Sequence, residues 1–319
     1  MSLIGIDEIR AAATRVAGKV VRTPLLPALW ADPARPLLLK PESLQPTGAF
    51  KLRGATNKIA TLVAAGHTGG VVAHSSGNHA QAVAAAAAAA GLSAVIVMPE
   101  GAAAVKVAAT QALGAEVVLV PPAERESRAL ELAAEKGLAM VPPYDDAAVI
   151  AGQGTVGLEI VADAPAVDLV LVPISGGGLI SGIATAVASL RPEAAIIGVE
   201  PELAADAAES LRRGELVSWA PEQTYRTSAD GLRVTSLGAL PWAHVQKLVA
   251  DIVTVSEEEI RAAVRQLAVG SRLVAEPSGA VAAAAYLFHA DRLPHAAVTV
   301  AVVSGGNLDP AQLAAILAE

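Results

Sequence analysis

The chain contains no cysteine, and this absence removes several kinds of chemistry at once. Thiol nucleophiles, disulfide bonds, iron-sulfur clusters and cysteine-bound zinc are all excluded, which fits an intracellular enzyme. Aromatic residues are also scarce, at 3% of 319 residues, although 53% of the chain is hydrophobic. The interior must therefore consist mainly of alanine and aliphatic side chains, and the length allows two domains or one domain with a large insertion.

Positive charge is in the minority, since 23 Lys and Arg residues face 31 Asp and Glu residues and the net charge is -8. Nucleic-acid binding requires clustered basic side chains, so we expect no nucleic-acid partner. The longest apolar run, residues 82–98, is mostly alanine and is interrupted by Gly91, so it is weaker than the roughly 20 strongly apolar residues of a membrane span. The N-terminal stretch carries Asp7 and Glu8 and is typical of a capped helix rather than a signal sequence. We therefore expect a soluble, cytoplasmic protein without a membrane partner.

From residue 70 onward, short aliphatic runs alternate with helical stretches. The successive segments are GVVAHS, NHAQAVAAAAAAA, SAVIVM, AAAVKVAATQAL, AEVVLV, ERESRALELAAEK and LAMV. Continuous apolar strands, followed by helices that end at glycines such as Gly91, Gly114 and Gly137, are typical of βαβ units. This block therefore predicts a parallel sheet of about four strands.

A second alternating block begins at VDLVLVPISGGG, continues through AAIIGVEP and DIVTVSEEEIRAAVRQLA, and ends at AVTVAVVSGGN. Residues 213–250 between its halves are rich in Gly, Pro, Trp and Arg, so we expect irregular loops there. The N-terminal 60 residues do not form a closed unit, and we expect them to pack with this second block. The predicted domains are a discontinuous large one, residues 1–67 and 144–319, and a small inserted α/β domain, residues 68–143. Because ligands of open α/β sheets bind beyond the carboxyl ends of the strands, the site should lie in the cleft between the domains.

One glycine-rich turn follows an apolar strand in VPISGGGLISGIATA. Its members are Ser175, Gly176, Gly177 and Gly178, and a helix begins near Leu179. Backbone N–H groups that converge at a helix N-terminus suit a phosphate group, although a tight packing turn would have the same composition. The spacing matches neither GxGxxG nor a P-loop.

Two further polar turns also follow apolar strands. In AHSSGNHAQA, the pair Ser76 and Asn78 could bind a carboxylate and a ring substituent, or could simply cap the helix. In AVVSGGNLDP, Ser304 is either a turn serine or a hydroxyl that faces a ligand beyond the sheet edge. Lys51, which follows the ring of Phe50 in QPTGAFKLRGA, would by itself be a surface lysine. Taken together, a phosphate cradle, a carboxylate site, an amide, a hydroxyl and a lysine after an aromatic ring are the parts of a pyridoxal phosphate site.

The order of the motifs leads to a family resemblance. PTGAFKLRGA, SSGNHAQA, VIAGQGT, SGGGL, EPSGA and VSGGN follow one another along the chain. In this the sequence resembles the fold type II pyridoxal-phosphate enzymes, and within them the serine/threonine dehydratase and serine racemase branch. The resemblance implies a homodimer with a tryptophan synthase β-like α/β fold, in which two parallel-sheet αβα domains hold the cofactor in the interdomain cleft.

The same resemblance implies a role for each matching residue. Lys51 would form the Schiff base with pyridoxal 5'-phosphate, and Ser76 would contact the substrate and act as an acid/base in a racemase. The implied cofactor-binding residues are Phe50, Lys51, Asn78, Ser175, Gly176, Gly177, Gly178, Leu179, Glu276 and Ser304. The implied substrate-binding residues are Ser75, Ser76, Gly77, Asn78 and His79. Because His74 and His79 show no catalytic or metal-ligand spacing, a structural role is the alternative for both.

GVEPELAADAAES resembles the divalent-cation site of this branch. The resemblance implies that Glu200, the carbonyl of Ala204 and Asp206 bind Mg²⁺ or another divalent cation, which prefers oxygen ligands. Without the resemblance, Glu200 would simply end a strand and Asp206 would be a solvated helix residue.

The predicted activity is β-elimination from L-serine, L-threonine or a related 3-hydroxy amino acid, which gives a 2-oxo acid and ammonia. Tyr144 stands where dehydratases usually have an aromatic residue and animal serine racemases an asparagine, which favours a dehydratase. Serine racemisation remains an alternative, and so does elimination from 3-hydroxyaspartate, whose extra carboxylate Arg128 or Arg233 could bind. Outside catalysis, a nucleotide-binding α/β module would give Lys51 no role.

Overall fold

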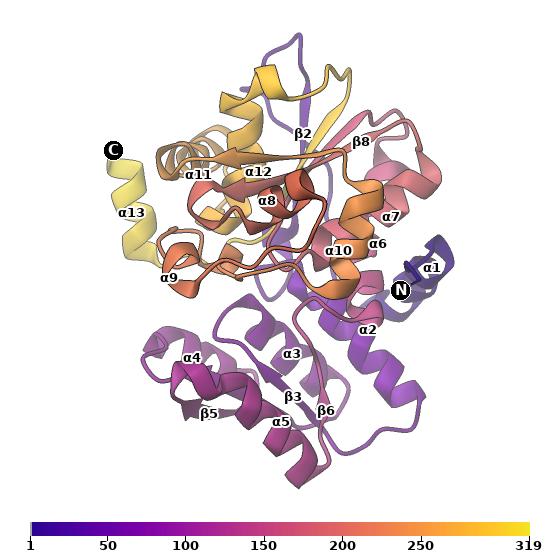
Figure 1. The fold of residues 1–319 in the computed structure, drawn as a ribbon, viewed down its shortest axis with the longest axis vertical. Coiled ribbons are helices and arrows are strands. Elements are labelled where there is room, and N and C mark those ends of the chain that lie inside the picture. The colour runs from indigo at the N-terminus through magenta and orange to yellow at the C-terminus, as the bar shows by residue number, and fades with distance from the viewer. Residues whose placement is uncertain (1) are drawn as a thin grey trace.

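The computed structural model describes residues 2–319 as two sheets, each with helices on both faces (Figure 1). The larger sheet has six strands in the order β1-β2-β10-β7-β8-β9, and the smaller has four in the order β5-β4-β3-β6. Only the edge pair β1 and β2 is antiparallel among the described strand pairs. The strands are β1 Leu26–Pro27, β2 Leu37–Pro41, β3 Val71–His74, β4 Ala94–Pro99, β5 Glu116–Val120, β6 Ala139–Met140, β7 Leu169–Pro173, β8 Ala195–Pro201, β9 Asp251–Val255 and β10 Thr299–Val303.

Helices connect and cover these strands. The α-helices are α1 Ile6–Val16, α2 Lys51–Ala64, α3 Asn78–Ala89, α4 Ala104–Ala112, α5 Arg125–Lys136, α6 Ala147–Asp163, α7 Gly178–Leu190, α8 Asp206–Arg213, α9 Pro221–Thr224, α10 Ala239–Leu248, α11 Glu257–Ser271, α12 Pro277–Phe288 and α13 Pro310–Ala318. Short 3₁₀ turns are η1 Glu42–Leu44, η2 Pro122–Glu124, η3 Glu202–Ala204, η4 Asp230–Leu232 and η5 Ala290–Arg292. The four parallel strands expected after residue 70 are present, and α5 ends at the left-handed Gly137, where φ is 64°.

Alternate side chains of the central strands enter different cores. In β7, Leu169 and Leu171 pack with α11 and α12, whereas Val170 and Val172 pack with α6 and α7 on the opposite face. The same alternation divides the small sheet between α3 on one face and α5 on the other. Since both faces of the inner strands β4 and β7 are buried, polar residues are excluded from these two strands, which explains their continuous apolar sequence.

The N-terminal residues pack with the second block, as expected. Ile9 of α1 is fully buried against Ile150 and Ala151 of α6, and strand β2 pairs with β10. The loop expected over residues 213–250 is wrong for its last part, which forms α10. Gly238 and Pro241 mark the beginning of that helix, because a proline is tolerated in the first helical turn.

Helix α2 lies between the two sheets and contacts both α3 and α6 (Figure 1). The predicted domain limits at residues 67/68 and 143/144 stay a prediction. More important for function is the strand order, because β10 lies between β2 and β7 and so brings the loop before Lys51, the Ser304 turn and the glycine turn to the same edge of the large sheet. Along residues 2–319, no helix is both long enough and apolar enough to cross a membrane.

Candidate active site

Lys51 is the first residue of α2 and lies at the junction of several loops. Its Nζ donates a hydrogen bond to the carbonyl of Pro143 at 2.7 Å and lies 5.2 Å from the ring centroid of Phe50. Burial lowers the pKa of the Lys51 amine to about 8. An amine in this environment is available in its neutral, nucleophilic form near physiological pH.

The loop before Lys51 is fastened to the turn after β10. Phe50 N donates to the carbonyl of Ser304 at 3.0 Å, and Gly306 N donates to the carbonyl of Gly48 at 2.9 Å. Ser304 is 4% exposed, and its hydroxyl lies 3.4 Å from the carbonyl of Ser278. These bonds bring Lys51 and Ser304, both predicted to bind the cofactor, to the same place.

Below this loop lies a buried ionic network that the sequence did not reveal. Arg53 donates to both carboxylate oxygens of Glu42, at 2.7 and 2.8 Å, and to both oxygens of Glu159, at 2.7 and 2.8 Å. Lys40 donates to Glu159 at 2.6 Å. Two cations and two carboxylates therefore balance one another, and the network holds η1 and the start of α2 against α6. The KLRGA motif contained Arg53, but its partners are too distant in sequence to be inferred.

The serine turn after β3 leads directly into Asn78. Asn78 Nδ2 donates to Glu276 Oε1 at 2.6 Å, and Asn307 Nδ2 donates to Asn78 Oδ1 at 2.7 Å. Asn307 also donates to the carbonyl of Thr47 at 2.8 Å. Asn307 was quoted only as the last letter of VSGGN, so its role in fixing the Asn78 amide was missed.

Glu276 is an acidic side chain in a buried position, only 4% exposed. Burial, and then the nearby Asp230 carboxylate, raises the pKa of Glu276 to about 8, although the Asn78 amide opposes the shift. The protonated carboxyl group is therefore favoured near neutral pH. Glu276 N also donates to the carbonyl of Gly305, which ties the EPSGA motif to the VSGGN motif.

The glycine turn between β7 and α7 has no room for a side chain at Gly176 or Gly177. A Cβ on Gly176 would overlap the ring of Tyr144, and a Cβ on Gly177 would overlap Pro241. Gly177 also has a φ of 88°, which L side chains rarely adopt. The hydroxyl of Ser175 is buried and has no hydrogen-bond partner within residues 2–319.

Residues 143–145 connect this turn with Lys51. The Pro143 carbonyl accepts from Lys51, and Tyr144 packs on Gly176. Asp145 accepts from the backbone N–H groups of Ala239 and Leu240 at 3.1 and 3.0 Å, which caps α10. The lysine, the glycine turn and the first turn of α10 are therefore held by one short segment.

Comparisons with known proteins agree with this arrangement. A family model described as "pyridoxal-phosphate dependent enzyme" matches residues 16–305. The chain belongs to that family. The catabolic L-threonine dehydratase TdcB of Escherichia coli is 42% identical over 318 residues, which cover 98% of this chain and 96% of the relative. The L-threo-3-hydroxyaspartate ammonia-lyase of Saccharomyces cerevisiae is 39% identical and covers 96% of this chain and 94% of its own length.

Solved structures give the same result. The crystal structure of a T.th. threonine deaminase has a TM-score of 0.90 and 44% identity, and covers 96% of this chain and 99% of that one. Maize serine racemase has a TM-score of 0.92 and 37% identity, with 98% and 97% covered. The predicted fold type II architecture and the threonine dehydratase and serine racemase branch are confirmed. Membership of an enzyme family excludes the non-catalytic nucleotide-binding module.

The residues of this pyridoxal-phosphate enzyme fit its cofactor. The hydroxyl of Ser175, which has no hydrogen-bond partner within residues 2–319, lies in the turn that leads into α7. This hydroxyl and the N–H groups at the start of α7 both suit a phosphate group. The Lys51 amine, with its lowered pKa, suits covalent attachment. The assignment of individual residues to cofactor atoms stays a prediction.

The predicted cation ligands lie at the end of β8 and the start of α8. Glu200 is fully buried and accepts from the N–H groups of Ala207 and Ala208 at 3.2 and 2.8 Å. Burial, and then the neighbouring Asp206, raises the pKa of Glu200 well above its usual value. Asp206 is 1% exposed, and its Oδ2 has no hydrogen-bond partner in residues 2–319. Two adjacent buried carboxylates fit a hard divalent cation. No group of three Asp, Glu, His or Cys side chains converges in the described chain, so a cation would rely on carbonyl and water oxygens as well.

The histidines near the serine turn take different positions. His79 is 3% exposed, and its Nε2 lies 2.8 Å from the carbonyl of Val141. Burial, together with the charge of Lys51, lowers the pKa of His79 to about 3, so the ring is neutral and donates to that carbonyl. This contact supports the structural alternative, and the substrate-binding role stays a prediction. His74 is partly buried, and its pKa is also lowered by burial.

The two arginines considered for binding an extra carboxylate of the substrate lie in different parts of the structure. Arg128 lies on the exposed face of α5 and donates to Glu131 and Glu135. Arg233 lines a cavity that also contains Glu276 and Asn307, so it lies close to the predicted cofactor site.

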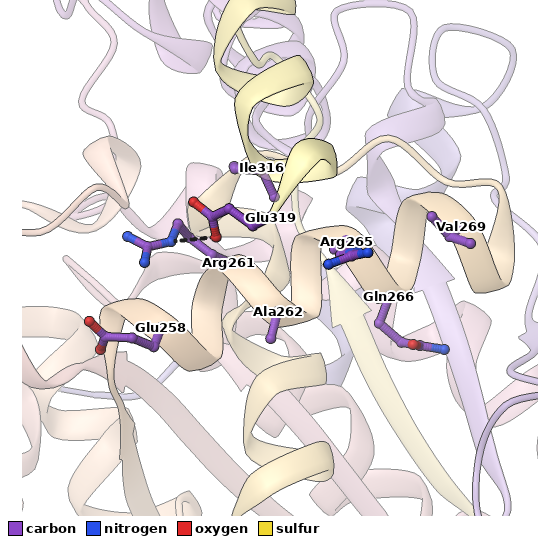
Figure 2. Close-up of a pocket in the computed structure, with 8 residues that line it drawn as sticks. All are labelled: Glu258, Arg261, Ala262, Arg265, Gln266, Val269, Ile316 and Glu319. Carbon is purple, nitrogen blue, oxygen red and sulfur yellow. Dashed lines mark hydrogen bonds and ion pairs between the residues drawn. The ribbon is translucent and has the colours of Figure 1, made fainter.

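Another cavity, of about 520 Å³, lies on the outer surface between α11 and α13 (Figure 2). The Arg261–Glu319 ion pair, with an N–O distance of 3.1 Å, lies in its wall. None of the predicted site residues lines it, so it is separate from the candidate active site.

Proposed function

We propose that this chain is an ammonia-lyase that converts L-threonine or L-serine to a 2-oxo acid and ammonia. The observation that carries the proposal is the amine of Lys51, whose pKa burial lowers to about 8, at the point where the glycine turn, the serine turn and the Ser304 turn meet. The relatives named as threonine dehydratase and threonine deaminase, at 42% and 44% identity, support the choice of reaction.

Lys51 has two tasks in this reaction. Its amine would hold the cofactor covalently, and in its free, neutral form it would accept the proton from the substrate's Cα. The carbonyl of Pro143, 2.7 Å from Nζ, orients the amine. When bound, the cofactor supplies the electron sink that makes the Cα proton removable.

Other residues orient the reactants. The turn of Ser75, Ser76 and Gly77 would bind the substrate carboxylate through Ser76, since Ser75 N donates to the Val97 carbonyl and Gly77 N to Ser75 Oγ. Asn78, fixed by Glu276 and Asn307, would hold a ring substituent of the cofactor. Ser304, a hydroxyl rather than a carboxylate, would face the pyridine nitrogen without forcing a positive charge on it. This moderate electron demand favours loss of the β-hydroxyl as water over more difficult carbanion chemistry.

Serine racemisation is the second candidate, because maize serine racemase shares the fold at a TM-score of 0.92. In that reaction Ser76 would return a proton to the opposite face of Cα. The aromatic Tyr144 against the glycine turn favours the lyase.

Two further features belong to the proposal. Glu200, the Ala204 carbonyl and Asp206 would bind Mg²⁺, supported by the partnerless Asp206 oxygen beside a second buried carboxylate. A homodimer, expected from the family resemblance, is proposed as the assembly.

Replacing Lys51 by alanine tests the assignment. The purified Lys51→Ala variant should lose the visible absorption of lysine-bound cofactor and lower kcat for L-threonine by at least about a thousandfold, since a covalent link and a general base are both removed. Lys58→Ala is the matched control, because Lys58 lies on the same helix and pairs with Asp146. A yellow, active Lys51→Ala variant would overturn the assignment.

Product analysis then tests the reaction itself. Wild-type protein is incubated separately with L-threonine and L-serine, while 2-oxo acid, ammonia and the D-isomer are measured together. We expect equal amounts of oxo acid and ammonia in excess over D-serine. Predominant D-serine would instead establish the racemase.

A further inference from the structure

A cavity of about 260 Å³ lies next to the cofactor-facing residues, between the two sheets. Glu276 and Asn307 line it, and both are hydrogen-bonded to Asn78. The other lining residues include Lys106 from α4 of the small unit and Asp230 from η4 of the large unit. The cavity therefore adjoins the side chains that hold the Asn78 amide, and residues of both units line it.

An ion pair crosses this cavity. Lys106 Nζ lies 2.6 Å from Asp230 Oδ2, and the two side chains are 34% and 40% exposed. Asp230 is held in place, because Gly231 N donates to Ser278 Oγ at 2.9 Å and Leu232 is buried in the core. Both charges reach Glu276, since Asp230 raises its pKa and Lys106 lowers it. The pair is thus close enough to act on a charge at the active site.

The remaining charges of the cavity have other partners. Arg233 donates from Nε and Nη2 to the carbonyl of Thr227, and its guanidinium lies 5.7 Å from the ring centroid of Tyr225. Asp309 accepts from Ala311 N at 2.8 Å and caps α13. Lys106, by contrast, is bound to a single carboxylate, which a second carboxylate could replace.

We propose that Asp230 makes the enzyme select substrates by the charge of their side chain. Asp230 neutralises Lys106, so the cleft prefers neutral 3-hydroxy amino acids over 3-hydroxyaspartate. A substrate with a second carboxylate must either displace Asp230 from Lys106, which leaves Asp230 without its cation, or lie beside an intact pair and meet repulsion from Asp230. A hydroxyl or methyl side chain meets neither cost. This inference rests on the proposed ammonia-lyase function and specifies its substrate class.

Asp230→Asn tests the inference with a change of charge but almost none of shape. The ratio of kcat/KM for L-threo-3-hydroxyaspartate to kcat/KM for L-threonine should rise about two- to fivefold, the range of one partly exposed charge interaction. The gain should shrink at high ionic strength, which screens exposed charges. Adding Lys106→Met to Asp230→Asn should abolish the gain, since the freed cation is then gone.

Asp309→Asn is the matched control, because it removes an equal charge from the same cavity without touching Lys106. An equal rise in Asp309→Asn, or no rise in Asp230→Asn, would contradict the inference. If wild type converts L-threonine and the ratio stays constant, the inference alone fails.

Binding of unreactive acids keeps the inference testable without turnover. Succinate and butanoate have the same number of carbons but differ by one carboxylate, and their binding to the holoenzyme can be measured by calorimetry. Asp230→Asn should tighten the binding of succinate relative to butanoate by the same factor of about two to five. An unchanged relative affinity would contradict the inference even if the protein had no lyase activity. A lack of lyase activity would separately contradict the proposed function.

Discussion

Replacing Glu42 by glutamine should destabilise the protein strongly, although the two side chains have nearly the same shape. Glu42 is fully buried, and each of its oxygens accepts two hydrogen bonds. Oε1 accepts from Thr23 Oγ1 and Arg53 Nη2, and Oε2 accepts from Arg53 Nε and Gln45 Nε2. An amide nitrogen in either position would therefore face two donors.

The size of the effect follows from the charge balance. In the wild type, Arg53 and Lys40 are neutralised by Glu42 and Glu159, and the glutamine leaves one buried positive charge uncompensated. Breaking a buried ion pair by removing one partner costs about 3–5 kcal/mol. At roughly 2 °C per kcal/mol for a chain of this length, Tm should fall by roughly 6–10 °C.

The assay is thermal and urea unfolding of Glu42→Gln and wild type at the same excess of pyridoxal phosphate, because cofactor binding itself adds stability. Glu131→Gln is the control, since Glu131 pairs with Arg128 on the surface and is 58% exposed. Its free energy of unfolding should stay within about 0.5 kcal/mol of wild type.

Acid should reduce the difference between the two proteins. Burial alone would raise the pKa of Glu42, but the Arg53 guanidinium outweighs it and holds the pKa below its usual value. The stability that Glu42 contributes is therefore complete above the pKa of an unfolded glutamate, about 4.3, and is lost as the pH falls through the folded value. A Glu42→Gln protein within about 1 kcal/mol of wild type at pH 7 would refute the reasoning.

Two further outcomes are expected. Gly176→Ala should weaken pyridoxal phosphate binding at least about tenfold, because the added Cβ would overlap Tyr144 and displace the turn. Equilibrium titration measures this affinity. Gly214→Ala is the control and should bind the cofactor normally, since no atom lies within 4 Å of its added Cβ. At a free cation concentration of about a hundred times Kd, a chelator should lower the free energy of unfolding of the wild type by about 3 kcal/mol. The Asp206→Asn variant should be insensitive to the chelator, and equal sensitivity of the two proteins would contradict the cation site.

Local patterns were sufficient for the strands and turns of the site. The apolar runs of β7 and β10, the helices that end at Gly114 and Gly137, and the lysine after Phe50 are all features of neighbouring residues. Their signals depend on backbone geometry and on burial of both sheet faces, which the periodicity of a few residues already expresses. Helix α10 was missed because residues such as Gly238 and Pro241 occur both at helix starts and in loops.

By itself, the sequence determined which residues could hold a phosphate, a carboxylate and a covalent cofactor, and in which order they occur. Only the tertiary structure decided their partners: Asn78 meets Glu276 across 198 residues, Lys106 meets Asp230 across 124, and Arg53 meets Glu159 across 106. These contacts exist because the start of α3 lies against the start of α12, because α2 packs on α6, and because α4 lies across from η4. Such neighbours are fixed by the packing of whole layers, which leaves no trace in any short stretch of the chain.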